Sequence, residues 1–386
     1  MTIFGSRKAY RALRVAKSSL GAAANAMRSR ASRQARRQIA LREGEIAALR
    51  RELARIQGFP DGRPPGPSPA GTPVFFVIGQ QKSGTTWLMR MLDSHPEILC
   101  RGEGRFFGGG WRQESIKLVD AKRPPSSLYN AILGSEYLRL WVERSVWSRN
   151  EKADEHLANL TRMAVDYFLV GELSKTDKRM VGDKSPLLTP ETIKEISKIY
   201  PEARVIHIIR DGRDAAVSAA HHSRNFGKRG RGSRAPARNG ERGQGPRETP
   251  NSHESVFPEG QLEKLAADWG SRVSKTVEDG PPLLGAGYAE VRYEDLLVRP
   301  EEEMRRLLGF LGVKANEEAA RRCVSSASFE RLSRGRKRGQ EDPTSFFRKG
   351  VAGDWSSVFT EQDRKVFKQE AGDLLVELGY EKDHDW

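Results

Sequence analysis

The pattern of hydrophobic and polar positions predicts short buried strands that alternate with amphipathic helices. Apolar and β-branched residues concentrate in three runs, Val74–Ile78, Arg204–Arg210 and Tyr288–Tyr293, and each run has the length of a buried strand. A polar loop and a helical pattern follow the first two runs, at 85–92 and 211–220. This repeated order of strand, loop and helix favours an α/β fold with a doubly wound parallel sheet, whose ligands bind beyond the carboxyl ends of the strands.

Further helices are predicted around these units. Their patterns lie at 127–170 (two or three helices), 190–199, 262–277, 301–312, 316–324 and 361–378. Residues 94–99 lead from a helix end into an extended segment. We interpret the polar stretch Val181–Pro186 as a loop.

Composition divides the chain into an extension, a linker and a globular part. Residues 1–57 combine Ala, Arg and Leu with a short heptad-like apolar repeat, which predicts a basic helical extension similar to a coiled coil. Residues 58–73 contain six prolines and are expected to form an extended linker. A globular domain is expected over 74–386. Within it, the Gly- and Arg-rich residues 224–256 are predicted to be a disordered insertion.

The net charge of +15 belongs to two segments rather than to the whole chain. Lys and Arg strongly outnumber Asp and Glu in residues 1–57 and 224–248, and the remainder is close to neutral. Nucleic acid is therefore not the expected partner of the core. The basic extension suits an anionic membrane surface or self-association, with a solvated helix as the plain alternative. Two cysteines and no apolar run of membrane-spanning length favour a cytoplasmic protein that could lie at a membrane periphery.

The loop after the first strand has the chemistry of a phosphate site. Gly79 and Gly84 have the spacing of Walker A glycines, but Thr85–Thr86 follow them and the lysine comes earlier, at Lys82. Loop N–H groups, the positive end of the helix, the lysine and hydroxyls such as that of Ser83 can together bind an anion. A lysine inside the loop could reach a bridging oxygen of the ligand, and its displacement weakens the case for a kinase or an ATPase.

Three stretches resemble the motifs of sulfotransferases that use 3′-phosphoadenylyl sulfate (PAPS). Gln81–Trp87 is similar to the family's 5′-phosphosulfate loop, with glutamine where proline is usual. Arg210 and Ser218 are similar to the pair that holds the 3′-phosphate, and Arg348–Gly350 followed by Gly353–Trp355 is similar to a second 3′-phosphate loop. The resemblance covers the globular part and is strongest to bacterial, carbohydrate-type and tyrosylprotein-type members of the family. It implies a P-loop-NTPase-like α/β fold.

The resemblance also implies roles for individual residues. PAPS and its product, 3′-phosphoadenosine 5′-phosphate (PAP), would be bound by residues of these motifs and of two shorter matches, at Tyr293 and at Ser328–Phe329. The full set is Lys82, Ser83, Gly84, Thr85, Thr86, Trp87, Arg210, Ser218, Tyr293, Ser328, Phe329, Arg348, Lys349 and Gly350. Sulfuryl transfer needs neutralisation of the charge on the phosphosulfate bridge and a base for the acceptor proton. Lys82 is expected to stabilise the leaving bridge oxygen, and no metal is expected.

Glu103 is the candidate base. The segment Gly102–Phe107 resembles the Glu-x-x-Phe-Phe segment of carbohydrate sulfotransferases, whose glutamate takes the acceptor proton, and Lys184 resembles a lysine near the acceptor in those enzymes. His221 and His222 stay open as alternatives because geometry decides between candidate bases before pKa does. A third histidine, at 207, lies in the middle of a predicted strand and is expected in the core.

Two other functions are compatible with parts of the sequence. A nucleotide kinase of the same fold would depend on Mg²⁺. A basic scaffold with an inactive core would bind a membrane or nucleic acid through residues 1–57 and 224–248. The combined motifs favour a sulfotransferase that acts on a hydroxyl, less readily an amine, of a carbohydrate, glycolipid or other small acceptor, whose identity the sequence leaves undefined.

Overall fold

A parallel sheet forms the centre of the protein. The computed structural model describes residues 73–108, 127–148, 152–186, 188–231 and 254–386. The sheet has five strands in the order β2-β3-β1-β4-β5, and every neighbouring pair is parallel. The strands are β1 (Val74–Ile78), β2 (Ile98–Gly102), β3 (Met180–Ser185), β4 (Arg204–Ile209) and β5 (Tyr288–Arg292). The predicted α/β class is confirmed, and all five carboxyl ends lie at one edge of the sheet.

Helices cover the sheet between and after the strands. They are α2 (Thr85–Asp93), α3 (Leu128–Leu133), α4 (Glu136–Arg144), α5 (Ala153–Leu173), α6 (Thr192–Ile199), α7 (Gly212–Arg231), α8 (Gln261–Leu284), α9 (Tyr293–Val298), α10 (Pro300–Leu311), α11 (Glu317–Ser326), α12 (Phe329–Leu332) and α13 (Glu361–Glu377), with the short 3-10 helices η2 (Gly285–Gly287) and η3 (Asp354–Ser357). The helices predicted for the globular part are therefore present, and α8 continues past its predicted end at 277.

The insertion predicted at 224–256 begins later than expected. Helix α7 continues to Arg231, so the helical backbone extends eight residues into the segment that composition marked as disordered. Most of the predicted insertion, at 232–253, lies outside the described residues, and so do the extension 1–57 and nearly all of the linker 58–73. The predictions for these segments stay predictions.

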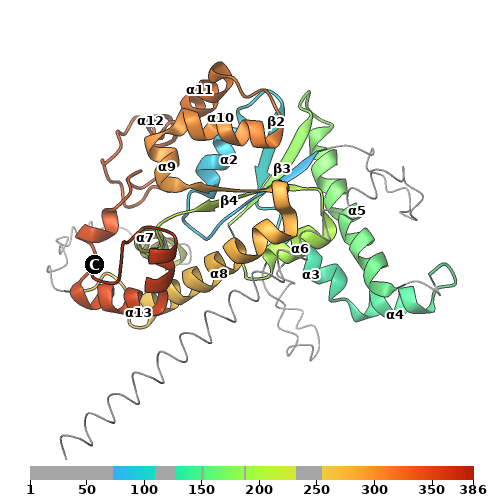
Figure 1. The fold of residues 1–386 in the computed structure, drawn as a ribbon, viewed down its shortest axis with the longest axis horizontal. Helices are drawn as coiled ribbons and strands as arrows, with labels where there is room; N and C mark the ends of the chain where they lie inside the picture. The colour runs from blue at the N-terminus through green and yellow to red at the C-terminus, as the bar shows by residue number, and fades with distance from the viewer. Residues whose placement is uncertain (1–72, 109–126, 149–151, 187, 232–253) are drawn as a thin grey trace, which may run out of the picture.

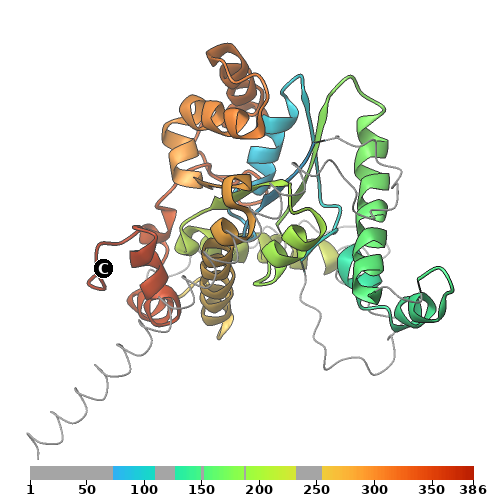
Figure 2. The same cartoon turned by 45° about the vertical axis from the view of Figure 1, so that its right-hand side comes forward.

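The alternation of side chains along β1 builds a core on each face of the sheet. Phe75 and Val77 pack with α2, α10 and α11, whereas Phe76 and Ile78 pack with α5 and α6. All four side chains are buried because a parallel sheet with helices on both faces leaves neither side to water. Figures 1 and 2 show α10 and α11 beside α2 on one side of the sheet and the long α5 on the other.

A third apolar cluster supports the end of β4. It joins α7, α8 and α13 around Trp269 and Phe367, whose ring centroids are 6.1 Å apart. The indole N–H of Trp269 donates to the backbone carbonyl of Arg210 at 3.1 Å. The core thus fixes the backbone of Arg210, the residue that follows β4, at the carboxyl edge of the sheet.

One element differs from its prediction. The polar stretch Val181–Pro186, interpreted as a loop, is largely strand β3, which pairs with β1 and β2 and is buried along its length. Gly182 leaves room for Phe75, since a Cβ there would lie 2.3 Å from the ring. Asp183 accepts the Gly104 N–H at 3.0 Å, and Lys184 lies 2.6 Å from a carboxylate. Polar residues can occupy this central strand because partners at its end satisfy them.

The described helices also bear on membrane association. None of them is both long enough and apolar enough to cross a bilayer.

Candidate active site

The loop between β1 and α2 presents an uncapped helix N-terminus at the carboxyl edge of the sheet. Gly84, the residue before α2, has φ +95°, and no side chain caps the helix. Lys82 is also left-handed, with φ +70°. The Ser83 hydroxyl donates to the Gln80 carbonyl inside the loop. The first N–H groups of α2 are therefore not occupied by a capping side chain, and they lie in the positive field of the helix dipole, which suits an anion.

Two glycines let this loop pass close to its neighbours. A Cβ on Gly79 would lie 2.6 Å from the Ile208 carbonyl oxygen, and one on Gly84 would lie 2.6 Å from the Tyr293 ring. The positive φ of Gly84 adds a second reason for glycine at that position. Close packing thus explains the Walker-like glycine spacing even though the lysine is displaced.

A cavity of about 310 Å³ opens beside the loop. Its wall is assembled from the loop and the start of α2, the residues that follow β2, β3, β4 and β5, helix α7, and residues between 329 and 351. Most residues that the sequence predicted for the site line this cavity: Lys82, Gly84, Thr85, Thr86, Trp87, Glu103, Arg210, Ser218, Tyr293, Phe329, Arg348, Lys349 and Gly350. Motifs far apart in the chain therefore meet in one place.

Three predicted residues are not part of the cavity lining. Ser83 is buried and bonds within the loop, as described above. Ser328 caps α12, where its hydroxyl accepts the Arg331 N–H at 3.4 Å. Lys184 is buried in β3 and reaches the cavity through its contact with Glu103. In this structure the two serine hydroxyls have local backbone partners.

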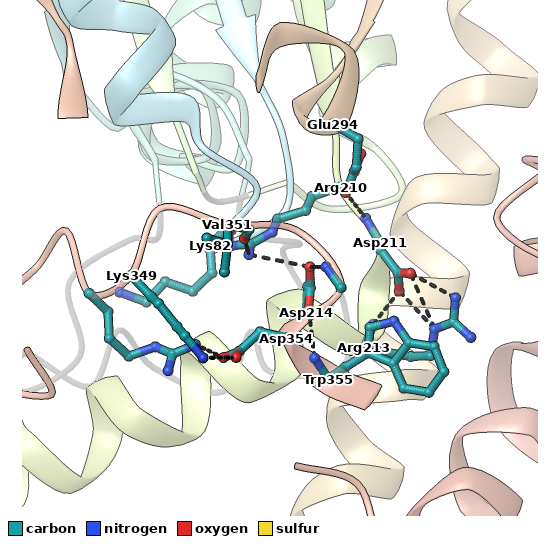
Figure 3. Close-up of polar contacts among 12 residues, drawn as sticks. Lys82, Arg210, Asp211, Arg213, Asp214, Glu294, Lys349, Val351, Asp354 and Trp355 are labelled. Carbon is teal, nitrogen blue, oxygen red and sulfur yellow. Dashed lines mark hydrogen bonds and ion pairs between the residues drawn. The ribbon is translucent and has the colours of Figure 1, made fainter. Parts of the chain in front are cut away.

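Arg210 points into the cavity from the end of β4. Its guanidinium donates to the carbonyls of Lys82 and Val351 at 3.1 and 3.2 Å (Figure 3). It also lies 4.4 Å from the centre of the Tyr293 ring. It also forms an ion pair with Asp214 at 3.5 Å. Within the described residues its buried Nε has no hydrogen-bond partner. A buried cation with an unused donor is suited to an anionic ligand.

The segment that ends in η3 brings two more cations to the cavity. Lys349 pairs with Asp354 at 2.5 Å (Figure 3). Arg348 pairs with the same carboxylate. Asp214 accepts the backbone N–H of Trp355 at 3.0 Å. Asp214, which pairs with Arg210, therefore also fixes the 348–355 segment. The cations at the end of β4 and in that segment are thus held in a fixed arrangement. Burial raises the pKa of Asp214, and the nearby arginine opposes that rise.

Glu103 lies at the mouth of the cavity, directly after β2. Its side chain is 52% exposed, while the Lys184 side chain that contacts it is 4% exposed, and the two charged groups are 2.6 Å apart. The adjacent Asp183 is buried, and burial raises its pKa to about 7, although the hydrogen bond from Gly104 acts in the opposite direction. A carboxylate that is open to the cavity and fixed by a buried lysine has the placement of a general base.

The ammonium group of Lys82 is less basic than an ordinary lysine. Burial and the charge of Arg210 lower its pKa from 10.5 to about 8, and Glu103 opposes this shift. The ammonium nitrogen lies 4.9 Å from the centre of the Phe346 ring. Lys82 is thus a cation in the wall of the cavity, placed over an aromatic face.

Several lining residues were missed by the sequence reasoning. They are Gln81, Arg105, Pro186, Leu297, Leu332, Arg338, Phe346, Phe347 and Val351. Phe346 and Phe347 directly precede the Arg-Lys-Gly motif, so their position was a usable signal. Arg105 occupies an unspecified position of the Gly102–Phe107 segment and Arg338 belongs to no motif, so only the folded structure shows that both reach the cavity.

The histidines separate clearly. His222 lines the cavity, and burial lowers its pKa. His207 is fully buried, its Nδ1 lies 2.9 Å from the Tyr288 hydroxyl, and burial lowers its pKa to about 3. The expectation that His207 belongs to the core is confirmed.

The fold and the cavity define a class of protein. Cationic side chains and an uncapped helix N-terminus surround one cavity at the carboxyl edge of a parallel sheet, as expected for an α/β enzyme that binds a phosphorylated ligand. Within the described residues, no three His, Cys, Asp or Glu side chains converge as metal ligands would.

Comparison with known proteins gives the family. Residues 73–317 match the model of the sulfotransferase family, and the chain belongs to that family. It is 23% identical over 278 residues to protein-tyrosine sulfotransferase A of Caenorhabditis elegans, covering 68% of this chain and 57% of that protein. A shorter match to human sulfotransferase 1C2 has 29% identity over 86 residues, covering 20% of this chain and 29% of that protein. The chain thus spans little more than half the length of the nematode relative.

Solved structures of sulfotransferases also align with the fold. The mouse sulfotransferase SULT7A1 complexed with PAP aligns with a TM-score of 0.44 and 17% identity, covering 80% of this chain and 85% of that chain.

Proposed function

We propose that this protein transfers a sulfuryl group from PAPS to a hydroxyl group of an acceptor. One observation supports this most strongly: a single cavity joins the loop before α2, Arg210 with Ser218, and the Arg348–Gly350 segment to a carboxylate at its mouth. Three cationic or N–H-rich sites in one cavity suit a ligand with two separate phosphate groups. A Walker-type site needs only the first of them. The kinase alternative loses support because the chain belongs to the sulfotransferase family.

The nucleotide would lie along the cavity with its two charged ends apart. The N-terminus of α2, with Thr85 and Thr86, would hold the 5′-phosphosulfate. Arg210, Ser218 and the 348–350 segment would hold the 3′-phosphate, and for this Arg348 and Lys349 would share or release Asp354. The aromatic side chains of Trp87, Tyr293 and Phe329 line the same cavity and are the proposed contacts of the adenine.

The transfer step follows from the positions of Glu103 and Lys82. The acceptor oxygen attacks sulfur while its proton passes to the Glu103 carboxylate. The bond between sulfur and the bridging oxygen breaks, and Lys82 stabilises the negative charge that develops on that oxygen as PAP leaves. Lys184 keeps the base in place through its 2.6 Å contact.

The acceptor is proposed only as a chemical class, a compound that carries a hydroxyl group. A carbohydrate, glycolipid or other small hydroxyl compound is our proposal, and a tyrosine side chain of a protein is a second candidate because relatives are named protein-tyrosine sulfotransferases. Cytoplasmic location, and membrane binding or self-association through residues 1–57, stay predictions from composition.

Thermal shift with PAP tests the proposal. We expect PAP to raise the melting temperature well above the effect of 5′-AMP or ATP with Mg²⁺, and Arg210→Ala to abolish the difference. Arg321→Ala, which removes an exposed arginine of α11, serves as the matched control and should keep the full PAP response. An equal response to ATP with Mg²⁺ would favour the kinase. If no nucleotide shifts the melting temperature, the scaffold alternative is favoured.

A further inference from the structure

Arg213 is a buried cation that is not part of the cavity wall. It lies in the first turn of α7, its side chain is 2% exposed, and its Nη2 donates to Asp211 at 2.7 Å (Figure 3). Its guanidinium also forms an ion pair with Glu381. Its pKa is raised despite burial, because the hydrogen bonds and charges of the two carboxylates outweigh desolvation. A buried arginine whose charge is balanced by two carboxylates has a structural role rather than a ligand-binding one.

The guanidinium of Arg213 also packs against two indole rings. It lies 3.7 Å from the ring centre of Trp355 and 4.4 Å from that of Trp386. The two rings meet edge to face, with centroids 5.7 Å apart. Trp355 belongs to η3, whereas Trp386 belongs to the segment Tyr380–Trp386 that follows α13.

A second contact of the same segment reaches the end of β4 independently. The Tyr380 hydroxyl donates to Glu294 at 3.0 Å, and the other oxygen of Glu294 accepts the backbone N–H of Asp211 at 3.0 Å. Burial and Glu294 both raise the pKa of Tyr380, so its hydroxyl remains a donor. The segment therefore holds Asp211 from two sides, through Glu294 at its backbone and through Arg213 at its carboxylate.

These contacts converge on the residues around the strand-end arginine. Asp211 directly follows Arg210, and Trp355 donates its backbone N–H to Asp214, the ion-pair partner of Arg210. The Tyr380–Trp386 segment itself does not line the cavity.

We propose that the Tyr380–Trp386 segment is a positioning element for the 3′-phosphate end of the nucleotide site, acting through Arg213 and Trp355. This inference rests on the proposed function, since it presumes that Arg210 and the 348–350 segment bind the 3′-phosphate. Loss of the segment's contacts would loosen Asp211 and η3, and with them the alignment of the cations. Among the described residues, no hydrogen bond, ion pair or ring contact joins the segment to the N-terminus of α2, and its link to the loop before α2 runs only through Arg210. The 5′-phosphate site should therefore be affected much less.

Affinity for two nucleotides separates positioning from general stability. In the full chain, Trp386→Ala and Glu381→Gln are compared with wild type for binding of PAP and of 5′-AMP, which lacks the 3′-phosphate. We expect PAP binding to weaken by about tenfold and 5′-AMP binding to change by less than about twofold. Lys382→Ala, at an exposed position of the same segment, is the matched control and should leave both affinities unchanged. In activity assays the loss should appear in KM for PAPS rather than in kcat.

Glu381→Gln keeps the side-chain shape and provides the answer if Trp386→Ala does not fold. Equal weakening of PAP and 5′-AMP, or undiminished PAP affinity in the folded variants, would overturn the positioning role. A wild-type protein that binds PAP no better than 5′-AMP would instead overturn the proposed function, and the inference with it.

Discussion

The buried ammonium group of Lys184 lies 2.6 Å from the carboxylate of Glu103, and the two residues come from the ends of adjacent strands. Lys184 pairs in register with Gly102 of β2, so the sheet itself brings the lysine to the residue that follows that strand. A charge buried in a strand is costly unless it is paired, and the pair fixes where the carboxylate stands. The sheet geometry thus places a candidate base at the mouth of the cavity.

Replacement of Glu103 tests its role as the base. Glu103→Gln keeps the size of the side chain but cannot accept the acceptor proton, so we expect kcat to fall by about 10²–10⁴-fold. PAP affinity should change much less than kcat, because Glu103 is not one of the proposed phosphate contacts and acts on Lys82 only through its charge. Single-turnover transfer and PAP binding are the measurements. His222→Asn is the comparison, and a greater loss of kcat in that variant would transfer the role of base to the histidine.

Lys82 sets the expected pH dependence. Its pKa is lowered to about 8, so the ammonium is charged below this pH and neutral above it. Because the charged form stabilises the leaving oxygen, kcat/KM for PAPS should fall as pH rises through about 8, approaching tenfold per pH unit. The kcat profile should decline at a higher pH, since bound PAPS favours the charged lysine.

Lys82→Arg is the control for that profile. Arginine stays charged throughout this range, so the variant should lose the decline near pH 8 even if its rate is lower overall. A wild-type profile that is flat between pH 7 and pH 9.5 would be incompatible with this role of Lys82.

Gly84 tests the geometry of the loop. Gly84→Ala introduces a Cβ at positive φ and 2.6 Å from the Tyr293 ring, so we expect a loss of roughly 1–3 kcal/mol in the free energy of unfolding. Gly171→Ala is the matched control, because it lies within α5 with no atom in reach of the new methyl group and should be neutral or slightly stabilising. Urea unfolding of both variants gives the comparison. Equal stability of the two would show that the loop relaxes freely.

Local patterns in the sequence determined the strands at 74–78 and 204–209, the loop that ends at Gly84 and the order of the binding motifs. These features depend on neighbouring residues: apolar runs form buried strands, and glycine allows a left-handed turn. The family's motifs were likewise recognisable as short stretches of sequence, and the structure brings most of their residues to one cavity.

Only the tertiary structure decided where several polar residues lie and which partners they contact. Asp183 and Lys184 resemble loop residues in sequence, yet they occupy a central strand because the segment after β2 supplies their partners. Arg338 reaches the cavity without belonging to a motif, and the Tyr380–Trp386 segment contacts the neighbours of Arg210 although it lies about 170 residues later in the chain. Such placements depend on contacts between residues far apart in the chain, which local propensity does not encode.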